Sequence, residues 1–100
     1  MFYVYLYDVK PGKEQEIREW LKNRGTPYWK KIPEIKSVNT YIRHFGLGPR
    51  PQYQTWFEIE DLASLGSFLE GPRDEERQKM GKEFWDLVTN WSAMVVRKVA

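Results

Sequence analysis

Residues 38–61, VNTYIRHFGLGPRPQYQTWFEIED, decide the fold that we predict for this chain. Positions 38–45 are rich in β-branched and aromatic residues, and positions 53–59 resume the same pattern, which is typical of two strands. The connection between them holds two glycines and two prolines. Proline has no N–H for a sheet hydrogen bond and glycine favours turn angles, so the connection interrupts the ladder. The stretch therefore predicts a β-hairpin, which must bury one face against other elements to be stable.

The strand expected over residues 2–9 has aromatic side chains on one face and apolar side chains on the other. Successive side chains of a strand point to opposite faces. One face carries three tyrosines and the other three apolar residues, namely Tyr3, Tyr5 and Tyr7 against Phe2, Val4 and Leu6. A strand with two such faces is usually covered on both sides, so we expect it to be central in its sheet.

A helix is expected between this strand and the hairpin. Residues 13–24 place apolar side chains at helical spacing, with charged residues mostly on the other side. Gly25 is predicted to end this helix. Thr26 and Pro27 then have the residue types of an N-cap and a first helical residue, which predicts a short extra turn over residues 28–31.

The remaining elements follow the hairpin. Asp61 is a suitable N-cap for a helix over residues 62–69. A second helix is predicted over residues 73–90, with its charged first turns facing solvent and an apolar stripe further on. Residues 93–99 have the composition of a final strand.

The predicted order of elements is β-α-β-β-α-β in a single domain covering residues 1–100. Right-handed crossovers place the helices on one face of a four-stranded antiparallel sheet, which makes an α+β, ferredoxin-like protomer. The other face has no cover. At roughly 4.8 Å between strands and 3.3 Å per residue, that face measures several hundred Å². A patch of this size lined by aromatic residues marks an interface, so we predict a homodimer whose two sheets pack face to face.

Composition argues against several classes of partner. The chain has 16 lysine and arginine residues against 14 aspartate and glutamate residues, interleaved, whereas nucleic-acid binding requires a clustered basic face. It has no cysteine and one histidine, so no metal site is expected. No apolar run approaches the roughly 18 residues of a membrane span, and the first residues do not have the pattern of a secretion signal. We therefore expect a cytoplasmic protein with neither nucleic-acid nor membrane partners.

Three further segments carry a family resemblance through their order and spacing. They are VKPGK at 9–13 followed by the first helix, IPEIKSV at 32–38, and WFEIEDLASL at 56–65. Together they resemble the dimeric α/β-barrel superfamily, in particular the antibiotic-biosynthesis-monooxygenase-like and NIPSNAP-like families. The resemblance implies a dimeric α/β barrel with a pocket between sheet and helices in each protomer. Members include cofactor-free oxygenases, haem-degrading enzymes, isomerases and decarboxylases, so the fold does not determine the activity.

The haem-degrading branch can be tested by its residues. It places an asparagine on the first strand, an aromatic residue on the helix after the third strand, and a histidine ligand further on. By the resemblance, these positions fall near Tyr5, Phe68 and Gln78 in this sequence. Only the aromatic residue matches, which argues against haem degradation, and we expect no cofactor.

His44 and Tyr5 are the candidate catalytic residues. His44 is the only histidine, is placed on the second strand, and has the side chain whose unperturbed pKa suits a general base near neutral pH. The alternative is a structural histidine near a strand end. Tyr5 is a candidate hydrogen-bond donor to a substrate oxygen, and the alternative is that it packs in the barrel or the dimer contact.

The candidate ligand-binding residues are mainly aromatic: Trp20, Tyr41, Trp56 and Phe68, with Arg43 as a carboxylate-binding cation. Tyr3, Tyr5 and Tyr7 are predicted to form a stacking surface with Tyr41 and Trp56 for an aromatic ligand. Core packing is the alternative for the aromatic residues. For Arg43 the alternative is an ion pair with Glu58 across the hairpin.

Two hypotheses for function remain open. The first is a homodimer that holds an apolar or aromatic metabolite in a sheet–helix pocket and acts as a cofactor-independent oxygenase or isomerase. In that chemistry a protein base ionises the substrate, which then reacts with oxygen. The second is a non-enzymatic ligand-binding or interaction module, which a sheet–helix interface without a cavity above roughly 300 Å³ would favour.

Overall fold

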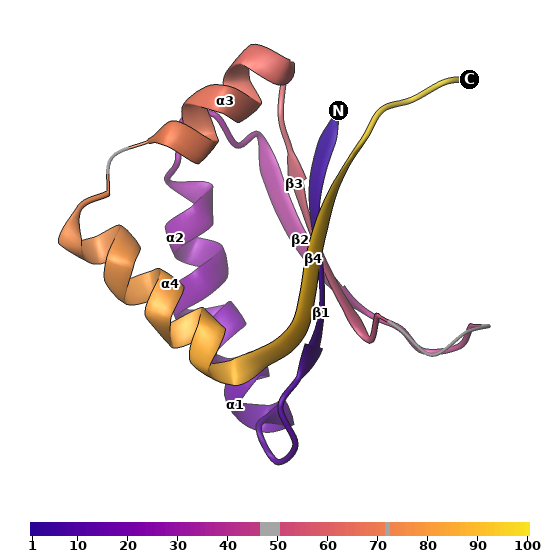
Figure 1. Cartoon of the computed structure of the whole chain (residues 1–100), viewed down its shortest axis with the longest axis vertical. Helices are drawn as coiled ribbons and strands as arrows, with labels where there is room; N and C mark the ends of the chain where they lie inside the picture. Colours follow the sequence, from indigo (N-terminus) through magenta and orange to yellow (C-terminus); the bar gives the residue numbers. More distant parts are fainter. Residues whose placement is uncertain (47–50, 72) are drawn as a thin grey trace.

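The computed structural model describes residues 1–46, 51–71 and 73–100, and it confirms the predicted α+β architecture. Four strands form one antiparallel sheet in the order β2-β3-β1-β4. They are β1 (Phe2–Val9), β2 (Ser37–Ile42), β3 (Tyr53–Glu58) and β4 (Val88–Val96). The helical elements are α1 (Glu14–Trp20), the π-helical segment η1 (Leu21–Gly25), α2 (Thr26–Lys30), α3 (Leu62–Glu70) and α4 (Glu75–Leu87). Figure 1 shows all of them on one side of the sheet, with β1 central as predicted.

The first helical run does not end at Gly25, so that prediction was wrong. The chain stays helical through this residue because η1 provides a wider turn, in which the Thr26 N–H donates to the Leu21 carbonyl five residues earlier. A proline in a helix lacks an N–H and crowds the preceding turn, and the wider turn accommodates Pro27. Gly25 also packs against the Trp20 ring, where a Cβ atom would lie 2.9 Å from each of two ring atoms.

The second half of the chain follows the predicted order with different boundaries. The Asp61 carboxylate accepts the Ser64 N–H at 2.8 Å and caps α3, as predicted. Helix α4 is shorter than expected and passes directly into β4 at Val88, which pairs with Val9 of β1. The prediction that residues 88–90 are helical was therefore wrong. Val88 continues the apolar stripe of α4 in the sequence, but as a β-branched residue it has a lower helix propensity and a higher strand propensity.

The strand register separates two faces of the sheet. Directly opposed residues of antiparallel strands share a face. Tyr3, Tyr5 and Tyr7 are opposed to Phe57, Thr55 and Tyr53 of β3, and these residues contact the helices. The opposite face carries Phe2, Val4 and Leu6 with Trp56 and Met94 on the neighbouring strands. The prediction that Tyr3, Tyr5 and Tyr7 form one surface with Tyr41 and Trp56 was therefore wrong, because those two residues lie on the other face.

The core between sheet and helices is built mainly of aromatic rings. Tyr7 and Phe57 have no exposed surface, and Tyr7 stacks on Tyr53 with ring centroids 5.8 Å apart. The Tyr7 and Thr55 hydroxyls are hydrogen-bonded at 2.9 Å, and Thr40 bonds the same Thr55 oxygen at 2.9 Å. These bonds satisfy polar groups in an interior where an unpaired hydroxyl is costly.

The sheet face without helices is apolar and partly exposed. Phe2 packs edge-on against Trp56 at 5.3 Å, and both side chains remain half-buried. Met94 is 39% exposed and Tyr41 is 55% exposed on the same face. Apolar patches of this kind on a small domain mark interaction surfaces. No helix in the described ranges is both long enough and apolar enough to cross a membrane.

Candidate functional site

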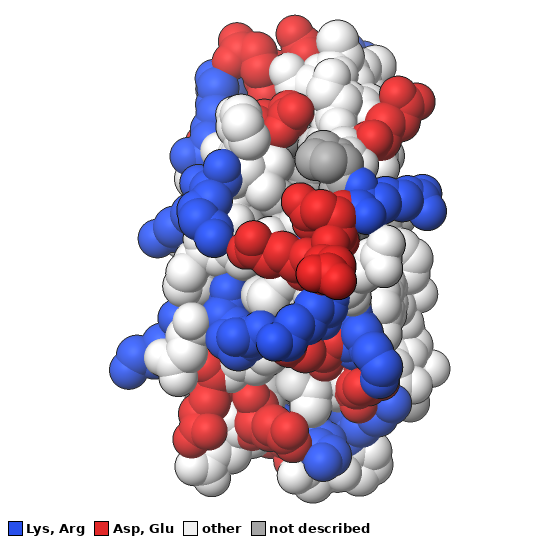
Figure 2. All heavy atoms as spheres, turned by 90° about the vertical axis from the view of Figure 1, so that its left-hand side faces the viewer, with Lys and Arg blue, Asp and Glu red and all other residues white. Residues whose placement is uncertain are grey.

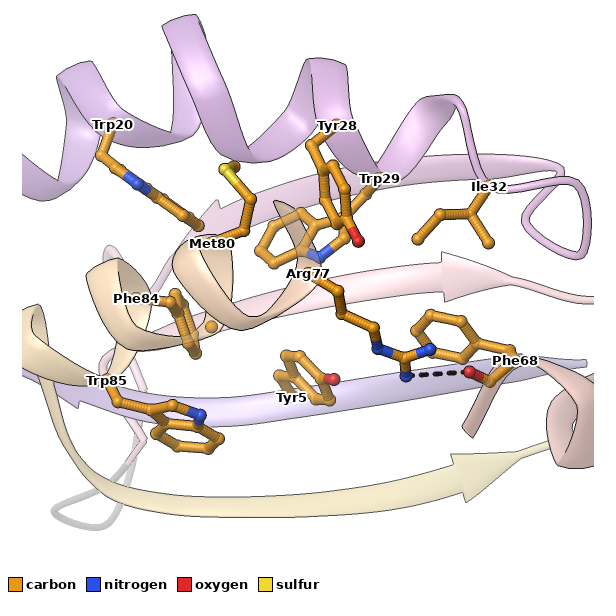
Figure 3. Close-up of a pocket in the computed structure, with 11 residues that line it drawn as sticks. Tyr5, Trp20, Tyr28, Trp29, Ile32, Phe68, Arg77, Met80, Phe84 and Trp85 are labelled. Carbon is orange, nitrogen blue, oxygen red and sulfur yellow. Dashed lines mark hydrogen bonds between the residues drawn. The ribbon is translucent and has the colours of Figure 1, made fainter. Parts of the chain in front are cut away.

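A cavity of about 170 Å³ lies between the helix-facing side of the sheet and the helices. Figure 3 shows it in close-up, with side chains entering from β1, α2 and α4. Its walls are almost entirely aromatic or apolar: Tyr5, Trp20, Tyr28, Trp29, Ile32, Phe68, Arg77, Met80, Gly81, Phe84 and Trp85. Aromatic side chains with a few polar groups among them are typical of small-molecule sites.

Tyr5 brings a polar atom from the sheet into this apolar cavity. Its ring packs edge-on against Phe57 at 4.9 Å and against Trp91 at 5.6 Å, which fixes its direction. Its hydroxyl has no hydrogen-bond partner among the described residues. Burial raises the pKa of the Tyr5 hydroxyl well above its ordinary value of 10.0, so the phenol stays protonated at neutral pH. Tyr5 can therefore donate a hydrogen bond to a molecule in the cavity.

Trp20 forms the opposite wall and is held by a charged pair at the surface. Its indole N–H donates to Glu83 at 2.8 Å, and the same carboxylate accepts from Arg24 at 2.6 Å. Hydrogen bonds from Arg24 and Trp20 lower the pKa of Glu83 from its ordinary value of 4.5. The Trp20 ring packs edge-on against Trp29 at 5.7 Å. This arrangement joins α1 to α4 and keeps the wall in place.

Among the described residues of the cavity wall, Arg77 is the one that carries a charge. Its guanidinium Nη2 donates to the Phe68 main-chain oxygen at 2.9 Å, and its Cζ lies 5.7 Å from the centroid of the Phe68 ring. Figure 3 shows the side chain extending from α4 to the space between Tyr5 and Phe68. The sequence placed Arg77 in a solvated run, whereas the side chain is half-buried. An arginine in an aromatic wall is suited to binding an anion or a carbonyl oxygen.

A larger groove of about 430 Å³ lies next to the cavity. The two spaces share four lining residues: Tyr28, Ile32, Phe68 and Arg77. The outer groove combines apolar and charged lining residues, and its walls include an exposed ion pair between Lys31 and Glu76 at 3.1 Å. The helix side of the molecule as a whole shows positive and negative side chains interleaved (Figure 2). These four shared residues therefore lie at the boundary between the mainly apolar cavity and the outer groove with its charged side chains.

The structure brings only part of the predicted site together. Tyr5, Trp20 and Phe68 all line the cavity. Tyr41 and Trp56 lie on the opposite face of the sheet and do not belong to its walls. The alternation of strand residues predicts such faces, but the pairing of one strand with another has to be known before residues of different strands can be assigned to the same face.

Arg43 and His44 lie beyond the end of β2. The Arg43 N–H donates to the Gln52 carbonyl at 2.7 Å, whereas Glu58 lies opposite Ser37 and accepts its hydroxyl at 3.1 Å. The alternative that pairs Arg43 with Glu58 was therefore wrong. His44 is exposed, does not lie on β2 as predicted, and is not part of the cavity wall. Its role as a general base stays a prediction.

Sequence reasoning missed the helical contribution to the wall. Arg77, Met80, Gly81 and Phe84 follow one another at the spacing of a single helix face and all line the cavity. That spacing was visible in the sequence, and it placed Arg77 on the same stripe as the buried Met80 and Phe84. Trp29 was predicted on a short helical turn but was not named as a candidate site residue, and the structure places it in the cavity wall. Among the described residues, no group of three or more His, Cys, Asp or Glu side chains is placed to hold a metal ion.

Comparison with solved structures confirms the predicted fold. An antibiotic biosynthesis monooxygenase-like protein from Bacteroides thetaiotaomicron superposes with a TM-score of 0.70 at 15% identity, covering 100% of this chain and 90% of that one. A NIPSNAP domain protein from Burkholderia xenovorans gives 0.69 at 12% identity, with coverage of 98% and 94%. A dimeric protein of unknown function with a ferredoxin-like fold, from Bacteroides fragilis, gives 0.60 at 13% identity, with coverage of 93% and 90%. Neither protein-family models nor curated proteins match the sequence.

Proposed function

We propose that this protein binds a small aromatic molecule in the cavity between sheet and helices. The observation that carries the proposal is the Tyr5 hydroxyl, a polar atom without a partner among the described residues, in a cavity whose wall is mainly aromatic. The cavity volume of about 170 Å³ suits a ligand of one ring. An apolar protein cavity of about 150 Å³ is large enough to bind benzene.

The same proposal includes a homodimer built through the helix-free sheet face. Its support is the exposed apolar surface around Trp56 and Met94, together with the dimeric state of one protein of the same fold. A stable interface of standard size buries about 800 Å² on each partner, which a four-stranded sheet with its rim provides. Pairing through this face would leave the helix-side cavity open to a ligand in each protomer.

The binding proposal is tested by filling the cavity from one of its walls. Gly81 lines the cavity, and a Cβ atom built on it meets nothing within 4 Å, so Gly81→Leu places a side chain at the wall without a clash at its first carbon. Gly66 on α3 has equally open surroundings and does not line the cavity, which makes Gly66→Leu the matched control.

Calorimetric titration with benzyl alcohol is the measurement. We expect the wild type and Gly66→Leu to bind with the same affinity and Gly81→Leu to bind at least about tenfold more weakly, because a blocked cavity loses most apolar contacts. Equal affinity of all three proteins would place the ligand elsewhere. Absence of binding to the wild type by any one-ring aromatic compound would end the proposal.

A second proposal concerns chemistry, and its support is the Tyr5 donor in the cavity together with the monooxygenase-like neighbour. In this proposal the protein acts as a cofactor-independent oxygenase on an ionisable phenol or enol. Tyr5 hydrogen-bonds to the substrate oxygen, and the proposed base is His44, which lies outside the cavity wall and must be reached by the ionisable end of the substrate. The alternative is a module that binds its ligand without turnover, and the cavity volume below about 300 Å³ favours that alternative.

Oxygen consumption in the presence of accepted ligands separates the two proposals. The oxygenase requires consumption by the wild type, a loss of rate of about 100-fold or more in His44→Ala, and a smaller loss in Tyr5→Phe. An unchanged rate in His44→Ala would remove the histidine from the mechanism. Ligands that bind without any oxygen uptake would establish the non-enzymatic alternative.

A further inference from the structure

We propose that the ligand of the sheet–helix cavity is an aromatic ring that carries an anionic oxygen group, and that Arg77 binds this group. The inference rests on the proposed function and specifies the class of its ligand.

The Arg77 charge is not neutralised by a carboxylate of the described residues. Its one side-chain hydrogen bond goes to the Phe68 main-chain oxygen, and its other close contact is the Phe68 ring. A guanidinium has five N–H donors, so most of the hydrogen-bonding capacity of Arg77 is unused. A half-buried cation with an aromatic neighbour and unused donors is well suited to pair with an anion, because partial burial strengthens the attraction.

Two phenols lie close enough to sense the same charge. Burial raises the pKa of both Tyr5 and Tyr28, and the positive charge of Arg77 opposes that rise in each case. The two hydroxyls come from opposite sides of the cavity, β1 and α2 (Figure 3). With the phenols protonated, the Arg77 end of the cavity offers hydrogen-bond donors and no carboxylate acceptor in its wall. Such a set of groups favours an anionic oxygen over a cationic group.

Two carboxylates that line the outer groove together with Arg77 have partners of their own. The Asp74 side chain caps α4 by accepting the Arg77 main-chain N–H at 2.8 Å. The Glu76 carboxylate pairs with Lys31 at 3.1 Å on the exposed side of the outer groove. Neither residue lines the cavity. Their charges raise the pKa of Tyr28, which keeps this phenol protonated as a donor.

The two adjoining spaces restrict the orientation of the ligand. The inner cavity offers a ring the wall that Trp29, Phe84 and Trp85 form, whereas Arg77 stands at the boundary with the outer groove of about 430 Å³. The anionic group would therefore lie at this boundary, and any larger substituent would extend into the groove. A ring with its charge at one end meets both requirements.

Affinities of three compounds of similar size test the charge preference in the wild type. They are benzoate, benzamide and benzylamine, which are anionic, neutral and cationic at neutral pH. We expect benzoate to bind at least about tenfold more tightly than benzamide, because hydrogen bonds to a charged group are roughly twice as strong as neutral ones, and benzylamine to bind most weakly. Benzamide binding as tightly as benzoate would overturn the inference while leaving cavity binding intact. Failure of all three to bind would overturn the proposed function and the inference together.

Two variants assign the preference to Arg77. Arg77→Gln should weaken benzoate binding about tenfold and keep the affinity for benzamide within about twofold of the wild-type value. Such a result would remove the preference for benzoate over benzamide while the cavity stays open. Lys79, on the same helix but outside the cavity wall, provides the control Lys79→Gln, with no change for either compound. If Arg77→Gln unfolds, Arg77→Lys keeps the charge but not the fork of donors, and it should retain part of the preference. A benzoate preference that survives in a folded Arg77→Gln protein would refute the role of Arg77.

Discussion

Gly25→Ala is the substitution for which the structure makes the sharpest stability prediction. Elsewhere in a helix this change is favourable, since alanine stabilises a helix by about 1 kcal/mol relative to glycine. Here a Cβ atom would lie 2.9 Å from each of two Trp20 ring atoms and still closer to a third. The ring cannot move away freely, because its N–H is bonded to Glu83 and it packs against Trp29 and Phe84.

The size of the effect follows from these two opposing contributions. Forcing an extra methyl group into a packed site costs about 3 kcal/mol at the upper end of observed values, since no flexible side chain is available to give way. Subtracting the helix gain of about 1 kcal/mol leaves a net loss of about 2 kcal/mol. For a domain of this size that loss lowers the melting temperature by about 10 °C.

Thermal unfolding followed by circular dichroism measures this difference against a matched substitution. Gly66→Ala introduces the same methyl group in α3, where nothing lies within 4 Å, and should raise the free energy of unfolding by about 1 kcal/mol. Both variants must be compared at one protein concentration, because self-association would add to stability. If the Gly25→Ala protein were as stable as the Gly66→Ala protein, the close contact between the Trp20 ring and Gly25 would be refuted.

Three further predictions concern the core, the pH dependence and the assembly. Thr55→Val removes the partner of the buried Tyr7 hydroxyl and should cost about 1–3 kcal/mol in urea unfolding; a neutral effect would contradict the hydrogen bond. The folded-state pKa of Glu83 lies below the unfolded value near 4.5, so its stabilisation is complete above that pH and is lost as the pH falls through the folded-state value. Glu83→Gln should therefore be less stable than the wild type at pH 7, with the difference shrinking toward pH 3; a constant difference in acid unfolding would refute this linkage. Trp56→Glu on the helix-free face should shift light scattering from dimer to monomer at micromolar concentration, and an unchanged mass would argue against a dimer through that face.

Much of the fold was predictable because local patterns and the global arrangement agree. The alternation of residues 2–9 predicted a central strand with its observed boundaries, and Asp61 marked the start of α3 correctly. The helix boundaries failed where tertiary contacts override a local signal. Glycine is a common residue at helix ends, which is why Gly25 was predicted to end its helix. In the structure its lack of a side chain leaves room for the Trp20 ring. Val88 continues the apolar pattern of α4, but in the structure it begins β4 and pairs with Val9 of β1.

The candidate site was only partly predictable because it is assembled across elements. Tyr5, Trp20 and Phe68 were found as aromatic residues on the correct faces of their own elements. Tyr41 was misplaced because a strand pattern does not reveal which faces of two strands coincide. Arg77 was assigned to solvent by its charge, although its helical spacing from the buried residues of α4 placed it on the inner stripe.

The central claim is that an aromatic molecule occupies the sheet–helix cavity, whose wall includes Tyr5 of the sheet and Phe84 of α4. Nuclear Overhauser contacts between bound benzoate and assigned side-chain protons of the wild type test it most directly. We predict contacts to Trp29 and Phe84 and none to Trp56, which lies on the opposite face of the sheet. Contacts to Trp56 without contacts to Phe84, at saturating benzoate, would contradict the account.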